Sequence, residues 1–432
     1  MKLRVRPGRP LLGTLHIPGD KSIAHRALLL GCIAEGVTRI RRFLAADVCL
    51  TTLRLMRALG VEVDEPARDE LYVHGVGLHG LQEPENVLDC GGSGTTLRLL
   101  CGILAGQSFA TFVTGSPRLR SRPMARIVEP LRKMGATVLG RNNGAFAPLA
   151  IQGGSLTGSH HDLAVASAQV KSCILLAGLY CFGSTSLREP APSRDHTERM
   201  LTAMGCAVES FDGGVRLEGR PLRPLDIVIP GDLSSAAFAI VAATLVPGSS
   251  VQMPDVGVNP GRVGIVEVLQ AAGASIKLTN VEDWNLEPVA RLSVESARLS
   301  AMQIGGSLVP RMIDEFPILA VAATQAQGRT IIADAAELRV KESDRVATTA
   351  GELRKLGARI EERADGFVVI GPTPLYGTTV HSHQDHRLAM ALAVAGLVAD
   401  GETIVEAADC IADSYPDFVQ ALRTIGADCE ML

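Results

Sequence analysis

Residues Ile17–Gly31 read IPGDKSIAHRALLLG, and residues Ile229–Ile240 repeat the opening as IPGDLSSAAFAI. Both stretches join a Pro-Gly turn to an apolar helical segment. The first copy carries Lys21, Ser22 and Arg26 at the start of its helix, whereas the second copy has no such cations. The repetition predicts a duplicated fold in which both turns mark a passage of the chain between domains and one copy also carries the site.

A strongly apolar helical segment recurs six times along the chain. A helix without a polar face must be buried, and each copy leads through a small polar or glycine-bearing turn into a β-branched run typical of a strand. The six copies begin SIAHRALLLG, GTTLRLLCGI, AQVKSCILLA, SSAAFAIVAA, FPILAVAATQ and HRLAMALAVA.

Six amphipathic helical segments alternate with the apolar ones, and each ends in a glycine that feeds a strand. Glycine suits this position because the residue after a helix often adopts a positive φ. The repeat length is roughly 70 residues. The glycines are Gly60, Gly135, Gly205, Gly273, Gly357 and Gly426.

Six such units contain too many residues for one hydrophobic core, so we expect two domains of three units. Residues 1–13 and 230–432 form one domain, closed by the N-terminal strand, and residues 20–228 form the inserted domain. The crossovers fall near 14–20 and 228–232, and the cleft between the domains is the expected ligand site. A solenoid of six units in one line is the alternative.

Composition excludes several classes of partner. The net charge of −4 and the aromatic content of 3% disfavour a nucleic-acid or membrane-surface binder. The nine cysteines form no C-x-x-C pair, which is typical of reduced thiols. The opening MKLRVRPGRPLLG lacks the apolar region of a signal peptide, and no apolar run reaches membrane length. We therefore expect a cytoplasmic protein. As a separate expectation, the protein acts as a monomer.

Polar and charged residues gather where the apolar helices begin. Helix N-termini carry free N–H groups and a partial positive charge, so together they favour a small polyanionic substrate. The groups are Lys21-Ser22 with His25-Arg26, Ser93 to Thr96, Ser167 to Gln169, Asp314-Glu315, and Asp385 to Arg387.

Each group also has a purely structural interpretation. GGSGTT is compatible with a capped turn, and Ser167 and Gln169 with helix caps. The basic loop around Arg122 is compatible with a solvated surface. In RVKESDR, Lys341 and Arg345 lie one turn apart if the segment is helical, as in a surface ion-pair helix.

Histidines cluster in SHH at Ser159–His161 and in HSHQDH at His381–His386. His381 and His383 would share one face of a strand. A zinc site would need further ligands, so we interpret these histidines as solvated and expect no metal.

Taken together, the motifs resemble the 5-enolpyruvylshikimate-3-phosphate synthase family. They cover almost the whole chain: PGDKSIAHRALLLG, GGSGTTLRLL, SRPMARIVEPLRKMGA, SAQVKSCILLAGL, PSRDHTERML, DEFPILAVAA, ELRVKESDRV and DHRLAMALAVAG. The resemblance implies transfer of the enolpyruvyl group of phosphoenolpyruvate to the 5-hydroxyl of shikimate 3-phosphate, with release of phosphate and no metal or organic cofactor. The expected fold class is α/β (α+β), with two domains, each of three βαβαββ-type units around buried helices in an inverse α/β-barrel-like arrangement, and a double chain crossover.

The resemblance also implies roles for individual residues. Asp314 is the candidate base and Glu342 the candidate acid, with Lys21 assisting, although the two carboxylate roles could be exchanged. The implied shikimate 3-phosphate contacts are Lys21, Ser22, Arg26, Ser167, Gln169, Arg194, Asp314 and Lys341. The implied phosphoenolpyruvate contacts are Lys21, Gly94, Arg122, Gln169, Arg345, His386 and Arg387, in a pocket that Glu342 completes.

The sequence departs from the family pattern at three positions. Gly92 stands where many members have asparagine, and Asp413 where some have a lysine at the phosphoenolpyruvate site. Ala168 replaces a serine, and we expect Lys171 and Arg194 to compensate for the missing phosphate donor.

Two alternatives remain. The sister transferase acting on UDP-N-acetylglucosamine has Lys-Asn after the Pro-Gly turn and often a cysteine in the basic loop, whereas this chain has Lys21-Ser22 and no cysteine near Arg122. A non-catalytic polyanion-binding protein would not need the carboxylates of Asp314 and Glu342.

Overall fold

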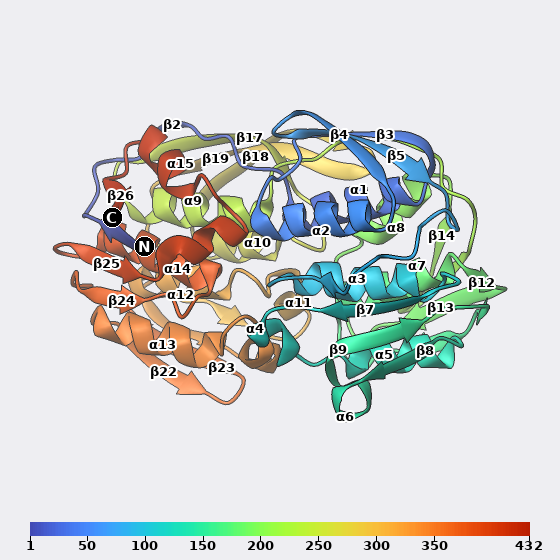
Figure 1. Cartoon of the computed structure of the whole chain (residues 1–432). Coiled ribbons are helices and arrows are strands. Elements are labelled where there is room, and N and C mark those ends of the chain that lie inside the picture. Colours follow the sequence, from blue (N-terminus) through green and yellow to red (C-terminus); the bar gives the residue numbers. More distant parts are fainter. The chain divides into compact units, whose positions relative to one another are not determined.

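The computed structural model describes every residue from Met1 to Leu432 and divides into two compact units (Figure 1). The first unit comprises Met1–Pro18, Pro230–Glu282 and Pro288–Leu432. The second unit comprises Gly19–Ile229 and a short piece, Asp283–Glu287. The chain therefore passes between units within both IPGD copies.

The second unit contains three four-stranded sheets, with strand orders β16-β3-β5-β4, β6-β7-β9-β8 and β11-β13-β15-β14. The strands are β3 (Glu35–Arg41), β4 (Glu62–Ala67), β5 (Glu70–Val76), β6 (Leu88–Asp89), β7 (Ala110–Thr114), β8 (Thr137–Gly140), β9 (Phe146–Gln152), β11 (His160–Asp162), β13 (Ser184–Arg188), β14 (Val208–Phe211), β15 (Gly214–Glu218) and β16 (Asp226–Val228), with β10 (Leu156–Thr157) and β12 (Cys181–Phe182) as a separate pair. The helices are α1 (Lys21–Cys32), α2 (Asp47–Ala58), α3 (Gly94–Leu104), α4 (Pro117–Arg120), α5 (Ala125–Lys133), α6 (Arg141–Gly144), α7 (Ala168–Gly178) and α8 (His196–Ala203).

The first unit repeats this plan, with strand orders β18-β19-β17-β2, β20-β21-β23-β22 and β24-β25-β1-β26. The strands are β1 (Lys2–Val5), β2 (Leu12–Thr14), β17 (Ser250–Gly257), β18 (Ser275–Trp284), β19 (Glu287–Glu295), β20 (Gln303–Ile304), β21 (Gly328–Ile332), β22 (Arg359–Arg363), β23 (Gly366–Gly371), β24 (Thr379–His381), β25 (Thr403–Glu406) and β26 (Cys429–Met431). The helices are α9 (Leu233–Leu245), α10 (Gly264–Ala271), α11 (Leu308–Arg311), α12 (Phe316–Gln325), α13 (Arg345–Lys355), α14 (His386–Val398) and α15 (Phe418–Thr424), with 3-10 helices η1 (Ala336–Val340) and η2 (Ala408–Asp413).

All six sheets share one pairing pattern. In each, one edge strand runs parallel to its neighbour. A parallel pair requires a crossover connection, and four of the sheets use one of the buried helices for it. In the remaining two sheets, β2 leads into α1 and β16 leads into α9, so each of these strands continues into the other unit's helix. The two IPGD copies are these connections, and the repeated βαβαββ plan of the predicted fold class is confirmed.

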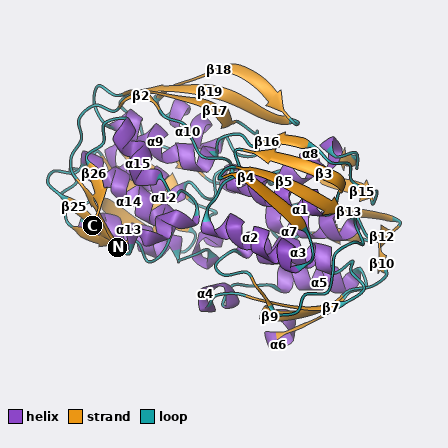
Figure 2. Ribbon diagram, turned by 45° about the horizontal axis from the view of Figure 1, so that its top comes forward, coloured by secondary structure: helices purple, strands orange, loops and turns teal.

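The six apolar segments form α1, α3, α7, α9, α12 and α14, and each is buried over most of its length. The six glycines that end the amphipathic helices all have a positive φ, as predicted. Within each unit the long buried helices lie inside and the sheets outside (Figure 2), the inverse of an ordinary α/β barrel. Each unit has its own apolar core.

The N-terminal strand completes the last sheet of the first unit. Strand β1 lies between β25 and β26 and pairs antiparallel with both. The backbone N–H of Leu432 donates to the carbonyl of Lys2 at 2.8 Å, so the two chain ends pair directly. No helix has the length and apolar character that a membrane crossing would require.

Candidate active site

In the second unit, α1 starts at the first IPGD copy. The carboxylate of Asp20 accepts a hydrogen bond from the Ile23 backbone N–H at 2.9 Å and caps the helix, which explains why the helix begins at Lys21. Lys21 and Ser22 are half-buried in the first turn. The next helical turn carries the larger cation, Arg26.

Arg26 is buried and connects three helices. Its guanidinium donates to the hydroxyls of Ser172 on α7 and Thr197 on α8, both at 2.7 Å, and to the Ser22 carbonyl at 2.9 Å. Burial lowers the pKa of Arg26 to about 10, so the side chain remains charged at neutral pH. The buried positive charge therefore lies directly beneath the first turn of α1.

Arg194, just before α8, acts electrostatically on Arg26 and lowers its pKa further. Lys171 points elsewhere. Its ammonium is 2.8 Å from the carboxylate of Glu189 and 2.7 Å from that of Glu198, and the side chain is 4% exposed. The expectation that Lys171 compensates for the serine missing at position 168 is therefore wrong, because its charge is already paired inside the unit.

Gly94 allows two arginines to approach the start of α3. A Cβ atom at this position would lie 2.9 Å from an Nη atom of Arg122 and 2.9 Å from an Nη atom of Arg98. Any larger residue would displace at least one guanidinium. The structure thus brings two of the predicted phosphoenolpyruvate residues, Gly94 and Arg122, next to each other.

Gln169 links α7 to α3. Its side-chain oxygen accepts from Arg98 at 2.6 Å, and its side-chain nitrogen donates to the Thr95 hydroxyl at 2.9 Å. Ser167 caps α7 through the N–H of Val170. Sequence reasoning did not assign Arg98 a role, although an arginine within an otherwise apolar buried helix was a usable signal.

In the first unit, a buried arginine gathers the two candidate catalytic carboxylates. Arg345, whose side chain is 1% exposed, donates to Asp314 at 3.2 Å and to Glu342 at 2.7 Å. It also donates to Asp385 at 2.8 Å. Burial alone would lower the pKa of Arg345, but the three carboxylates outweigh it and raise the pKa, so the guanidinium stays charged.

Asp385 is the N-cap of α14 and places the next two predicted residues. Its carboxylate accepts from the Arg387 backbone N–H at 3.0 Å. His386 and Arg387 form the buried first turn of the helix, and the Arg387 Nε lies 3.6 Å from the Asp314 carboxylate. Asp314, Glu342, Arg345 and Arg387 therefore meet at the starts of α12, α13 and α14, although Arg345 is already bonded to three acids.

The segment RVKESDR is not one helix. The 3-10 helix η1 ends at Val340, and α13 begins only at Arg345, capped by Asp344. The predicted one-turn relation of Lys341 and Arg345 on a helix is wrong, because the chain bends between them. Lys341 lies 3.8 Å from Glu337 instead.

The two histidine clusters do not form metal sites. No group of three or more His, Cys, Asp or Glu side chains is arranged to hold an ion. His381 ends β24, whereas His383 lies in the following turn with a positive φ. The prediction that both share a strand face is wrong, and His383 bonds Glu352 at 2.7 Å.

The second IPGD copy also carries a buried charge pair. Asp232 caps α9 through the Ser234 N–H and accepts from Arg262 at 2.6 Å. Both side chains are almost fully buried. The second copy has no cation of its own, but Arg262 from another segment neutralises the Asp232 carboxylate at this helix start.

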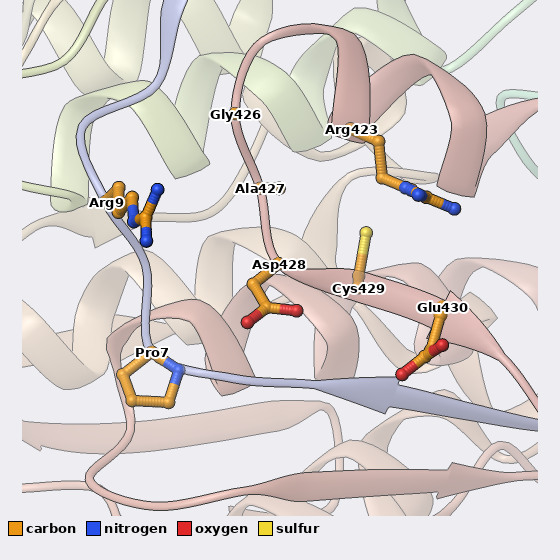
Figure 3. Close-up of a pocket in the computed structure, with 8 residues that line it drawn as sticks. All are labelled: Pro7, Arg9, Arg423, Gly426, Ala427, Asp428, Cys429 and Glu430. Carbon is orange, nitrogen blue, oxygen red and sulfur yellow. The ribbon is translucent and has the colours of Figure 1, made fainter.

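A surface pocket of about 370 Å³ lies in the first unit beside α15 and β26 (Figure 3). Asp428 lies between Arg9 and Arg423, so charges of both signs line the pocket. Its Cys429 thiol is buried, and burial raises its pKa to about 11. It includes none of the predicted site residues, and its mixed charge does not favour an anion.

The fold is one that this chain shares with an enolpyruvyl transferase. The structure matches an enolpyruvyl transferase of Streptomyces tendae with a TM-score of 0.80 over 99% of this chain and 98% of that chain. That pair is 20% identical, which shows the fold alone.

The family follows from closer matches. The family model of EPSP synthase (3-phosphoshikimate 1-carboxyvinyltransferase) matches residues 5–422, and the chain belongs to this family. An EPSP synthase structure from Acinetobacter baumannii is 40% identical with a TM-score of 0.89, covering 99% of each chain. A 3-phosphoshikimate 1-carboxyvinyltransferase from Pelotomaculum thermopropionicum is 52% identical over 99% of this chain and 100% of its own. The one from Desulforamulus reducens is 49% identical over 98% and 99%.

Proposed function

We propose that this protein transfers the enolpyruvyl group of phosphoenolpyruvate to the 5-hydroxyl of shikimate 3-phosphate and releases phosphate, a step of aromatic amino acid biosynthesis by the shikimate pathway. The observation that carries the proposal is the convergence of Asp314 and Glu342 on buried Arg345, with Arg387 beside Asp314, in a chain that belongs to the EPSP synthase family. A protein that only binds anions would gain nothing from carboxylates at this place.

Both substrates carry phosphate and carboxylate groups, which arginine binds well because its guanidinium can donate two parallel hydrogen bonds. We assign the shikimate 3-phosphate contacts to Lys21, Ser22, Arg26, Ser167, Gln169, Arg194, Asp314 and Lys341. We assign the phosphoenolpyruvate contacts to Lys21, Gly94, Arg122, Gln169, Arg345, His386 and Arg387. The approach of Arg122 to Gly94 and the bond of Gln169 to Arg98 support the second set.

The reaction is an addition followed by an elimination. Asp314 accepts the proton of the 5-hydroxyl while the hydroxyl oxygen bonds to C2 of phosphoenolpyruvate. Glu342 protonates the C3 methylene. In the resulting tetrahedral intermediate, the new methyl group returns a proton to the Glu342 carboxylate and the C2–O bond to phosphate breaks. The C2=C3 double bond forms again, now as the enol ether of the product. Lys21 assists the departing phosphate. No redox step occurs, and the family resemblance requires no metal or organic cofactor.

A phosphate-release assay tests the proposal. The protein is mixed with phosphoenolpyruvate and either shikimate 3-phosphate or UDP-N-acetylglucosamine. We expect phosphate only with shikimate 3-phosphate. Release only with the sugar nucleotide would assign the sister activity, and release with neither acceptor would favour a non-catalytic anion-binding protein.

We also propose that the protein acts as a monomer in the cytoplasm, with these two small molecules and no nucleic acid or membrane as partners. The small net charge of −4 supports the absence of a nucleic-acid partner. Light scattering should give the chain mass of 45.5 kDa. A mass of twice that value would contradict the monomer.

A further inference from the structure

The turn that leads into α14 is held by α13 at two points. Arg345, the first residue of α13, donates to Asp385 at 2.8 Å. Glu352 lies two turns further along the same helix and therefore on the same face. Its carboxylate accepts from the His381 backbone N–H at 2.9 Å and bonds the His383 ring at 2.7 Å. Side chains on one face of α13 therefore bond both ends of the segment His381–Asp385.

Glu352 is well suited to a permanent structural contact. Its side chain is 4% exposed, and Lys355 donates to both of its oxygens, at 2.9 and 2.8 Å. Burial by itself raises the pKa of Glu352, but the bonds from Lys355, the His381 N–H and His383 outweigh it and leave the pKa below its ordinary value. The carboxylate is therefore an ionised acceptor near neutral pH.

The segment that Glu352 holds has an unfavourable backbone. His383 and Gln384 have φ angles of 52° and 55° in succession, a left-handed conformation that residues other than glycine rarely adopt. Such a conformation persists only where its surroundings enforce it. The Ser382 hydroxyl accepts from the Gln384 N–H at 3.0 Å, and the His383 N–H donates to the His381 ring at 2.8 Å.

We propose that Glu352 is a positioning residue for the reaction. It holds His381 and His383 so that the strained turn delivers Asp385, His386 and Arg387 to the start of α14. Asp385 in turn orients Arg345. Glu352 is distant in sequence from His381 and His383, the two residues that it bonds. This inference rests on the proposed function, because it assigns His386 and Arg387 to phosphoenolpyruvate.

Kinetics of Glu352→Ala and Glu352→Gln provide the first test. The glutamine keeps one acceptor oxygen, so we expect an effect between those of wild type and alanine. Loss of one hydrogen bond to a charged group corresponds to about a tenfold change. The KM for phosphoenolpyruvate should therefore rise about tenfold in the alanine variant, with the KM for shikimate 3-phosphate changed much less.

Lys355→Met is the matched control, because Lys355 is half exposed and its hydrogen bonds go to the same carboxylate rather than to the turn. Its KM values should stay near those of wild type. An equal rise of both KM values in the alanine variant, or unchanged kinetics, would overturn the proposal.

Amide hydrogen exchange gives a readout that does not depend on activity. In Glu352→Ala the N–H groups of His383, Gln384, Asp385 and Arg387 should lose protection, whereas Lys355→Met should keep it. Wild-type protection in the alanine variant would refute the positioning role. If wild type itself releases no phosphate, the proposed function fails, and the exchange experiment still decides whether Glu352 holds the turn.

Discussion

At the residue scale, the two most deeply buried site arginines have different surroundings. Arg26 donates to hydroxyls and a backbone carbonyl, which are neutral, so its positive charge is not cancelled by its direct partners. Arg345 donates to three carboxylates and is fully compensated. A cation whose hydrogen-bond acceptors are neutral can still attract an anionic substrate. A cation that is paired with several carboxylates mainly fixes the positions of those carboxylates. We therefore expect Arg26 to act on substrate charge, and Arg345 to orient Asp314 and Glu342 in addition to its proposed contact with phosphoenolpyruvate.

The two carboxylates should be needed for turnover more than for binding. In Asp314→Ala and Glu342→Gln we expect kcat to fall by about a hundredfold or more, as is typical of the loss of a general acid or base. Substrate affinity, measured by calorimetry, should change much less. Near-normal kcat in either variant would remove that residue from the mechanism, and comparison of the two pH profiles would assign base and acid.

Gly94→Ala should weaken phosphoenolpyruvate binding without unfolding the protein. The new methyl group would lie 2.9 Å from the ends of Arg122 and Arg98, which are flexible enough to move but would then be misplaced. We expect the KM for phosphoenolpyruvate to rise about tenfold, the effect of one charged hydrogen bond, with an unchanged thermal midpoint. Gly92→Ala is the control, because nothing lies within 4 Å of a Cβ atom there.

His25 should make the protein less stable at acidic pH. It is buried on α1, with its Nδ1 2.8 Å from the Thr52 hydroxyl, and burial, followed by Lys21 and Arg26, lowers its pKa from 6.5 to about 3. Between those pH values the unfolded chain binds a proton that the folded chain does not. Stability therefore falls by about 1.4 kcal/mol for each pH unit below 6.5 until pH approaches 3.

Urea unfolding of wild type and His25→Asn across this pH range measures the effect. The variant is expected to be less stable near neutral pH but to lose less stability as the pH falls. Parallel pH dependences of the two proteins would contradict the assignment.

At the element scale, the hairpin of β18 and β19 serves both units. Its strands belong to a sheet of the first unit, but its tip, Asp283–Glu287, is part of the second. There Glu287 bonds the buried ring of His196, the first residue of α8, at 2.7 Å. Because Thr197 is the next residue and bonds Arg26, the hairpin tip supports the helix start that holds this cation.

Glu287→Ala should loosen α8. His196 would remain buried without its partner, and the opposite ring nitrogen already has none. Removal of one member of a buried pair costs about 3 kcal/mol. Hydrogen exchange should show reduced protection in α8, together with a higher KM for shikimate 3-phosphate.

Asn285→Ala at the same tip is the control, because Asn285 makes exposed or partly buried backbone contacts to Val228 and Asp226. Its effect on α8 should be small. Equal protection of α8 in wild type and Glu287→Ala would show that the tip does not support the helix.

At the scale of the whole molecule, the chain closes on itself within each unit. The second unit is completed by β16, which pairs with β3 from the unit's beginning, and the first unit by β1, which joins β25 to β26. Such closure ties sequence-distant segments into one sheet. The stability of the first unit should therefore depend on the first few residues of the chain.

Deletion of residues 1–6 should destabilise the first unit selectively. The deletion removes the strand that pairs with both β25 and β26, leaving their backbone groups without partners. We expect a lower thermal midpoint and loss of hydrogen-exchange protection in β25 and β26, with the sheets of the second unit still protected.

A circular permutant distinguishes the loss of strand β1 from a change in the position of the chain ends. A short linker joins Leu432 to Met1, whose neighbour Lys2 already pairs with Leu432, and new ends are opened at the exposed turn Asp212–Gly213. This protein should keep the wild-type midpoint and activity. If the permutant were as unstable as the deletion variant, the stability of the first unit would depend on the position of the chain ends and not on strand β1 alone.

The repeated plan was predictable because its signals are local. A helix such as α9 is apolar on every side, and Gly357 ends α13 with a φ of 98°, so composition and spacing sufficed. The residues of the candidate site were proposed from motifs through the family resemblance, and their roles stay predictions. The partners of those residues were not: Lys171 pairs with two acids, Arg98 bonds Gln169, and Lys341 lies outside α13.

The sequence by itself determined the alternation of buried and amphipathic helices, the glycine ends and the chain passages at both IPGD copies, since these depend on neighbours in the chain. Only the tertiary structure decided which buried charges neutralise one another. In the second copy Asp232 pairs with Arg262, and in the first copy Arg26 hydrogen-bonds neutral groups. Glu352 bonds a turn that lies far along the chain. Such pairings depend on distances of a few ångströms between segments remote in sequence, and hydrophobic periodicity carries no information about them.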